Sequence, residues 1–357
     1  MSNRVLLSLI LLCLSLRSPA QRMDAQQISK AATEFLPQAV TSLRTFIAIP
    51  NDGHDTIQIA NNLKWCVDAM ARRGFEVSII RSGSVPYVFA QRVYDRRLPV
   101  VLFYIQADGQ PVDASDWDQP NPYVAVLKQP TDRGWNEASW TSPFHKESRI
   151  FGRSSSDSKG PAIALLTALD VLASRKQKPT FNIKVIIDFQ EEMGSPTLPA
   201  LVKQNASLLA SKMVLIMDGT RHVSNLPTLN FGARGIATVT LKVFGPQSEL
   251  HSGQYGNYAP NPVFSLARIL SGMKDERGRV LIPGFYDGIS ISEAERDQIN
   301  DMPGNDGDLN QRLGIAAPEP ARDEKKDPEG QYQDTRSHMC GHLVHTKTRQ
   351  RGQHEKA

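Results

Sequence analysis

The chain has 357 residues, of which 40% are hydrophobic and 22% charged, as expected for a folded globular protein of one or two domains. The formal net charge is +4, but residues 1–20 contribute +2 and residues 334–357 contribute +3, which leaves −1 for residues 21–333. The body of the chain has no basic excess, and this argues against nucleic acid as a partner.

The N-terminus has the layout of a secretory signal. Arg4 precedes an apolar stretch over residues 5–16, and Ser18-Pro19-Ala20 supplies small residues for cleavage before a polar segment. We expect residues 1–20 to be a signal peptide, the protein to be secreted or periplasmic, and no membrane association after signal removal. An ordinary N-terminal helix is the alternative. Beyond Cys13, only Cys66 and Cys340 remain, too few and too far apart for a disulfide framework.

Residues 21–228 alternate between helical and strand patterns. Leu63, Val67 and Met70 keep helical spacing before Gly74, and a second helix is predicted over residues 161–173. The apolar runs 99–105, 182–189 and 213–217 are typical of strands buried on both faces. This order predicts an α/β catalytic domain with a parallel or mixed open sheet and helices on both faces.

The pattern changes in residues 229–333. Residues 237–244 alternate apolar and polar side chains, which predicts a strand with one solvated face, and Asn261-Pro262 opens a helix to about Leu270. We expect a second, smaller α+β domain with a long excursion over residues 275–330. The polar, basic segment 334–357 has no periodicity and is predicted to be unstructured.

Acidic residues follow the apolar runs. Ligands of open α/β sheets bind beyond the carboxyl ends of the strands, and carboxylates gathered there repel one another unless a cation holds them. We therefore expect a pair of divalent metal ions and a metallohydrolase. One of the adjacent Glu191 and Glu192 is expected to bind metal while the other acts as base. The acidic residues concerned are Asp108, Asp157, Glu191, Glu192 and Asp218.

Several motifs resemble a known family. They are GRSSSDSKG at 152–160, EEMGS at 191–195, GARG at 232–235 and LHSG at 250–253. Together with Asp218 they are similar to the dinuclear zinc exopeptidases, which include aminoacylase, succinyl-diaminopimelate desuccinylase and the carnosinase-type dipeptidases. IPGFYD at 282–287 and SEAER at 292–296 are most similar to the dipeptidases. The resemblance covers roughly residues 24–333.

The resemblance implies a two-domain fold: a mixed open-sheet catalytic domain with an inserted ferredoxin-like lid, here incomplete, through which a homodimer forms. It implies two divalent ions, zinc first and cobalt or manganese as alternatives. Asp157 would bridge the metals, with Glu192 and Asp218 as further ligands. Of the remaining residues, Glu191 would be the general base, Asp108 would orient a ligand, His251 would stabilise the oxyanion across the dimer, and Arg234 would anchor a substrate carboxylate. Taken alone, His251 before Ser-Gly is also typical of a surface turn.

The chain departs from that family at two points. Gln106-Ala-Asp108 stands where the family usually has His-x-Asp, and a glutamine offers only a neutral carbonyl oxygen to a metal. The resemblance also ends near Gln333, before the stretch that carries the family's last histidine ligand. On this interpretation each metal lacks its imidazole. The tail 338–345 (HMCGHLVH) has a composition that can bind metal, but we expect it to be unstructured.

The sequence thus predicts hydrolysis of an amide bond in a dipeptide or N-acyl amino acid by a bridging water, with Glu191 as base. A one-metal amidohydrolase that uses Gln106 is a second possibility. A third is an inactive, incomplete relative that acts as a binding protein or an unstable fragment.

Overall fold

The computed structural model describes residues 23–132, 134–218, 239–276, 279–288, 290, 292–293, 311 and 314–316. The chain divides into two units near residue 220. The predicted signal segment 1–20, the tail 334–357 and Arg234 lie outside the described residues, as does most of the predicted 275–330 excursion. Among the helices of the described part, none combines the length and the apolar character needed to cross a membrane.

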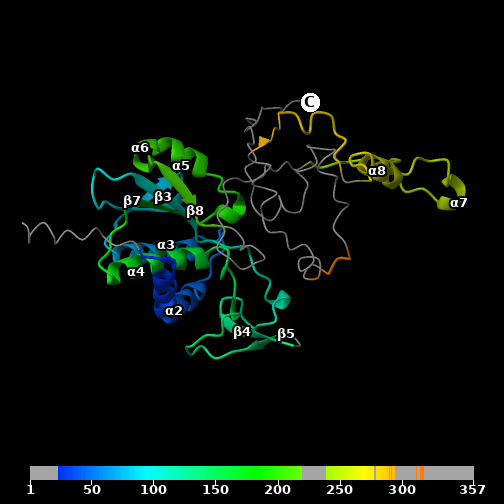
Figure 1. Ribbon diagram of the computed structural model, residues 1–357. Helices are drawn as coiled ribbons and strands as arrows, with labels where there is room; N and C mark the ends of the chain where they lie inside the picture. The colour runs from blue at the N-terminus through cyan, green and yellow to red at the C-terminus, as the bar shows by residue number, and fades with distance from the viewer. Residues whose placement is uncertain are drawn as a thin grey trace, which may run out of the picture. The chain divides into compact units, whose positions relative to one another are not determined.

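The first unit is built on a five-stranded mixed sheet of order β1-β2-β7-β3-β8 (Figure 1). Antiparallel pairing joins β1 to β2 and β2 to β7, while β3 runs parallel to both β7 and β8. The predicted mixed α/β fold is therefore confirmed. The strands are β1 (Glu76–Ser82), β2 (Val85–Arg92), β3 (Val100–Gln106), β7 (Asn182–Asp188) and β8 (Met213–Ile216).

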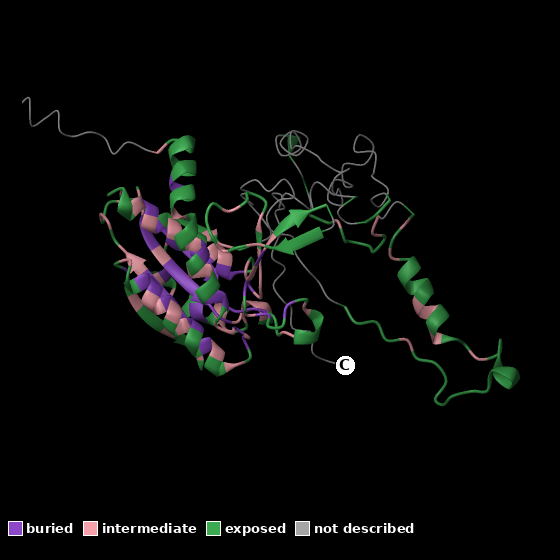
Figure 2. Cartoon of the chain, turned by 90° about the horizontal axis from the view of Figure 1, so that it is seen from below, coloured by how far each residue is buried: buried purple, intermediate pink, exposed green. Residues whose placement is uncertain are grey.

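Helices cover both faces of this sheet, as predicted (Figure 1). On one face lie α2 (Ala25–Ile47), α3 (Thr56–Ala71) and α4 (Lys159–Ser174), and on the other α5 (Leu198–Gln204) and α6 (Ala206–Leu209). Successive residues of a strand point to opposite faces. Val185 and Ile187 of β7 accordingly pack in the larger core beneath α2–α4, while Ile186 packs with Leu201 and Leu209 of α5 and α6. Figure 2 shows this buried layer in purple.

Local signals set where these helices begin and end. The Asp24 side chain accepts a hydrogen bond from the Gln27 N–H, and the Gln27 side chain accepts one from the Asp24 N–H, which completes a capping box on α2. Asp55 caps α3, and Gly74 follows with φ of 74°, the left-handed backbone that glycine adopts without strain. Cys66 of α3 is a core residue, as expected, and burial raises the pKa of its thiol to about 12.

One strand differs from its prediction. The run 213–217 was expected to be buried on both faces, but Met213, Val214 and Ile216 of β8 are each more than half exposed. The reason is its place at the end of the sheet order, where it pairs with β3 alone among the described strands. An apolar run identifies a strand, but its neighbours decide how far it is buried.

Short elements complete the described part. A second sheet of order β5-β4-β6 consists of β4 (Val126–Thr131), β5 (Gly134–Glu137) and β6 (Arg149–Phe151), and the 3₁₀ turns are η1 (Ala114–Asp116) and η2 (Glu191–Met193). The second unit contains α7 (Ser252–Tyr255) and α8 (Pro262–Ser271). Asn261 caps α8, which confirms the predicted helix.

The strand predicted over residues 237–244 is wrong for its described part. Residues 239–244 have no regular secondary structure. A strand needs a hydrogen-bonding neighbour, and no described residue pairs with this segment. The predicted lid domain and the boundaries 21–228 and 229–333 stay predictions.

Candidate active site

Strand topology brings three predicted site segments to one edge of the sheet. Gln106 at the end of β3 lies opposite Asp188 at the end of parallel β7, and Tyr104 of β3 lies opposite Ile216 at the end of parallel β8. The carboxyl ends of the three strands therefore meet at the same edge, where open α/β sheets bind ligands. Asp108, Glu191, Glu192 and Asp218 all follow these strand ends within a few residues.

Glu191 and Glu192 do not continue the strand in extended form. They begin the 3₁₀ turn η2, which ends at Gly194 in the left-handed region with φ of 79°. The Gly194 N–H donates to the Glu191 carbonyl at 2.7 Å. The two side chains are therefore separated by the geometry of a tight turn and not by the alternation of a strand.

Asp108 is buried against this turn. Its Oδ2 accepts a hydrogen bond from the Glu192 N–H at 3.0 Å, while its Oδ1 is buried without a hydrogen-bond partner. Burial raises the pKa of Asp108 to about 6, and the backbone N–H groups of Glu192 and Glu191 partly offset that rise. Gly53 allows the close approach, because a Cβ at this position would lie 3.2 Å from Asp108 Oδ2 and 3.0 Å from the Phe189 carbonyl oxygen.

Negative charge converges on Glu191. Burial is the largest cause that raises its pKa to about 7, and the next causes, in falling order, are the charges of Asp218, Glu192, Asp108 and Asp157. These four residues come from four separate segments of the chain. Negative charges from separate segments of the chain therefore act together on the Glu191 side chain.

The chemistry of these groups fits a bound divalent cation. Repelling carboxylates and the unpartnered Asp108 Oδ1 are both stabilised by nearby positive charge. Among the described residues, however, no three histidine, cysteine, aspartate or glutamate side chains form a group able to hold a metal ion. Asp157, Glu192 and Asp218 as ligands therefore stay a prediction, and binding would require them to approach one another.

Gln106 is buried and belongs to a small network of hydrogen-bonded side chains. The Ser158 hydroxyl donates to Gln106 Oε1 at 2.8 Å and also lies in hydrogen-bonding contact with Asp157 Oδ1. A hydroxyl carries one proton, so Ser158 serves one acceptor at a time. When it donates to Asp157, the Gln106 carbonyl oxygen is free to face a cation.

Lys159 ties the loop that carries Asp157 to the core. Its side chain is fully buried, and Nζ donates to the carbonyl oxygens of Phe46 at 2.8 Å and Ile49 at 2.6 Å. The ammonium also lies 4.5 Å from the centroid of the Phe46 ring. Burial lowers the pKa of Lys159 to about 7. Helix α4 begins at Lys159, two residues before the predicted start at Pro161.

His251 belongs to the second unit. It is exposed and caps α7, and its Nδ1 accepts a hydrogen bond from the Gly253 N–H at 3.1 Å. This is the surface-turn geometry that the sequence also allowed. Its role toward an oxyanion stays a prediction, and Arg234 lies outside the described residues.

Sequence reasoning missed two residues of the site, Ser158 and Asp188. Asp188 is fully buried and accepts hydrogen bonds from the residues on either side of Glu191 and Glu192. A signal for it was present, because an acidic residue that closes a largely apolar central strand needs buried partners. Ser158 gave no such signal.

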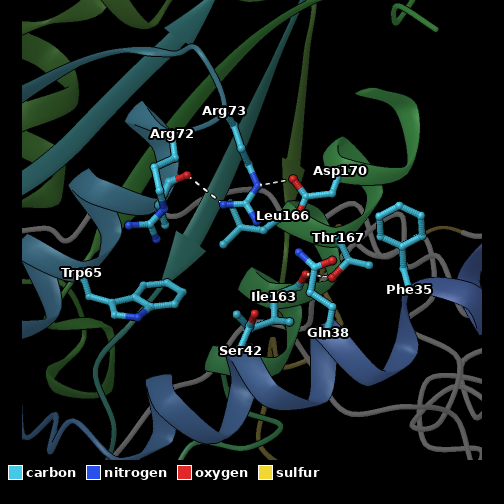
Figure 3. Close-up of a pocket in the computed structure, with 12 residues that line it drawn as sticks. Phe35, Gln38, Ser42, Trp65, Arg72, Arg73, Ile163, Leu166, Thr167 and Asp170 are labelled. Carbon is cyan, nitrogen blue, oxygen red and sulfur yellow. Dashed lines mark hydrogen bonds and ion pairs between the residues drawn. The ribbon is translucent and has the colours of Figure 1, made fainter. Parts of the chain in front are cut away.

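One cavity of the described part lies away from the acidic edge of the sheet. A space of about 40 Å³ between α2, α3 and α4 is lined by twelve residues, none of which is a predicted site residue (Figure 3).

Comparison with known proteins bears on the family resemblance. Residues 125–299 match the family model described as Peptidase family M20/M25/M40. The chain is 27% identical to the Cys-Gly metallodipeptidase DUG1 of Candida albicans, covering 79% of this chain and 58% of that protein. It is 26% identical to the Beta-Ala-His dipeptidase of Mus musculus, covering 72% and 52%. The chain thus spans between half and three-fifths of the length of these relatives.

Solved structures show the same fold. Human carnosine dipeptidase 1 has a TM-score of 0.62 at 21% identity, covering 84% of this chain and 63% of that one. The M20 family metallo-carboxypeptidase Sso-CP2 from Sulfolobus solfataricus has a TM-score of 0.61 at 23% identity, covering 81% and 62%. The predicted family is confirmed by these matches together with the order of the motifs. Residues 125–299 thus correspond to a domain of the M20/M25/M40 peptidase family.

Proposed function

We propose that this protein hydrolyses the amide bond of a dipeptide or N-acyl amino acid in a metal-dependent reaction, with Glu191 as the general base. The observation that carries the proposal is the position of Glu191. It lies at the carboxyl edge of the sheet, partly buried, with four other carboxylates close enough to raise its pKa. A partly buried base surrounded by potential cation ligands is the arrangement that metal-assisted hydrolysis needs.

Asp157, Glu192 and Asp218 would hold the metal, two ions by the family resemblance, with Gln106 offering an additional oxygen. A bound divalent ion supplies Lewis acidity and makes water a nucleophile at neutral pH. Glu191 takes the proton of the attacking water and passes it to the leaving amine. Asp108 would position Glu192, because the Asp108 Oδ2 accepts a hydrogen bond from the Glu192 N–H and so fixes the turn.

The relatives suggest the substrate class. The names of these relatives specify Cys-Gly and β-Ala-His dipeptides. Both are dipeptides with a free C-terminal carboxylate, so we propose a dipeptide with a free C-terminus. Arg234 would bind that carboxylate and His251 of a partner subunit would stabilise the oxyanion. Both roles, and the homodimer they need, belong to this proposal.

Glu191→Gln tests the base. The substitution keeps the size of the side chain but removes its capacity to accept a proton. We expect kcat for Cys-Gly or β-Ala-His hydrolysis to fall by roughly 100- to 10,000-fold, the usual contribution of proton transfer. Glu76→Gln on β1 is the matched control, since Glu76 is an exposed glutamate that bonds only Gln91. Equal activity in Glu191→Gln and wild type would refute the assignment of the base.

Metal analysis of the purified protein separates the remaining possibilities. Two ions per chain agree with the dinuclear site, and one ion agrees with the one-metal amidohydrolase that uses Gln106. A protein that binds no divalent ion at any concentration, and hydrolyses no dipeptide, would contradict the proposed function and favour a binding role.

A further inference from the structure

Asp188 is a charged residue in the most deeply buried strand of the sheet. It closes β7, three residues before Glu191, and it is 0% exposed. A carboxylate is costly to bury unless its oxygens accept hydrogen bonds. The groups that donate hydrogen bonds to the Asp188 carboxylate therefore indicate its role in the fold.

The hydrogen bonds to the Asp188 side chain come from both ends of the turn that carries Glu191 and Glu192. The Gln190 N–H donates to Oδ1 at 2.9 Å, immediately before the turn. The Ser195 hydroxyl donates to Oδ2 at 2.7 Å, immediately after it. Tyr104 of the neighbouring β3 donates to the same Oδ2 at 2.9 Å. One carboxylate thus joins the entry to the turn, its exit and the next strand.

The backbone of Asp188 binds the segment that carries Gln106 and Asp108. Its carbonyl oxygen accepts the Ala107 N–H at 2.9 Å, and it lies opposite Gln106 in the parallel ladder. Ala107 stands between Gln106 and Asp108. Because Asp108 Oδ2 in turn accepts the Glu192 N–H, the two segments are closed into one ring of hydrogen bonds.

We propose that Asp188 is a positioning residue that sets Glu191 and Glu192 relative to Gln106 and Asp108. This inference rests on the proposed function and deepens it. Three donors converge on two oxygens, and a carboxylate accepts all of them. An asparagine accepts on one side only and would present an N–H₂ group to whichever donors face its nitrogen. The hydrogen-bond donors around position 188 therefore require an aspartate, although an asparagine would occupy the same volume.

Asp188→Asn in the full chain is the test. A displacement of about 1 Å at a catalytic group can cost roughly 100-fold in rate. We expect kcat for dipeptide hydrolysis to fall by about that factor with KM changed little, because the misplaced turn weakens interactions made in the transition state and leaves substrate binding nearly unchanged. Hydrogen exchange of the peptide spanning residues 189–197 should become faster. Tyr104→Phe and Ser195→Ala, which each remove one donor, should give smaller losses.

Tyr87→Phe is the matched control. The Tyr87 hydroxyl is also part of a buried strand and contacts Thr197 Oγ1 at 2.9 Å, just beyond the same turn, without bonding Asp188. It should lower thermal stability by a similar amount while leaving kcat unchanged. A kcat for Asp188→Asn equal to that of Tyr87→Phe would overturn the proposal, whatever the two melting temperatures are.

Zn²⁺ titration keeps the inference testable if the wild-type protein hydrolyses no dipeptide. The loss of such outer partners typically weakens metal binding by about 10- to 100-fold. Weaker Zn²⁺ binding in Asp188→Asn, but not in Tyr87→Phe, would support the positioning role even though the proposed hydrolysis had failed. Unchanged affinity in Asp188→Asn would overturn it.

Discussion

The residue at position 106 is expected to affect which metal ion the site prefers. Gln106 closes β3, is buried and contacts Ser158. Where the resembling family usually has an imidazole, this chain offers a neutral carbonyl oxygen. Zinc prefers nitrogen and sulfur ligands, whereas oxygen ligands suit harder cations such as Mn²⁺. The substitution is expected to weaken zinc binding in particular.

Gln106→His should therefore bind Zn²⁺ at least roughly tenfold more tightly than wild type, which corresponds to about 1.4 kcal/mol. Competition with a fluorescent zinc chelator measures the difference. Gln106→Leu, which has no donor atom, should bind more weakly than wild type. Identical affinities in all three proteins would show that position 106 does not contribute to a metal site.

At the scale of elements, β7 is fixed at both ends by buried polar side chains. Asp188 closes the strand and Asn182 opens it. Asn182 Nδ2 donates to the carbonyl oxygens of Asp95 and Leu98, and its Oδ1 accepts the N–H groups of Tyr94 and Asp95, at 2.8–3.2 Å. One amide thus satisfies four backbone groups of the turn that leads into β3, and so aligns β3 with β7.

Asn182→Ala should lower the free energy of unfolding by about 2–4 kcal/mol, because four backbone groups lose a buried partner. Urea denaturation measures this change. Gln91→Ala removes a hydrogen bond to Glu76 at the surface of the same sheet, and its effect should stay within about 0.5 kcal/mol. Comparable losses in the two variants would mean that the turn finds other partners once Asn182 is removed.

Elements formed by local signals were the most predictable. The spacing of Leu63, Val67 and Met70 identified α3, and Asn261-Pro262 identified the start of α8. The turn η2 was not predicted, because it depends on Asp188, Tyr104 and Asp108 from other parts of the fold. The strand expected over residues 237–244 was wrong in its described part for a related reason, since alternation alone supplies no pairing partner.

At the scale of the whole first unit, the helical layer over the sheet is joined by an ion pair between helices that are distant in sequence. Arg73, just beyond α3, donates to both carboxylate oxygens of Asp170 in α4, at 2.8 and 2.6 Å (Figure 3). Both side chains are about one-fifth exposed. Arg73 also donates to the Ala69 carbonyl oxygen, which holds the guanidinium in place.

Asp170→Asn should destabilise the protein by about 1–3 kcal/mol, between the values for exposed and for fully buried pairs. Thermal and urea unfolding of the full chain measure the loss. The Lys64–Asp68 pair on α3 is the matched control, since its side chains are 77% and 48% exposed and Asp68→Asn should leave stability unchanged. If both variants unfold like wild type, the α3–α4 link contributes nothing to stability.

The sequence by itself determined the α/β class, the strands and helices with strong periodicity, and the set of acidic residues at the strand ends. These features depend on the apolar pattern of each segment and on short-range capping, which are local properties of the chain. Only the tertiary structure decided that Glu191 and Glu192 lie in a tight turn, that Gln106 contacts Ser158, and that Asp188 holds both halves of the site. Those facts require strands β3 and β7 to be side by side, because their hydrogen bonds join residues more than fifty positions apart.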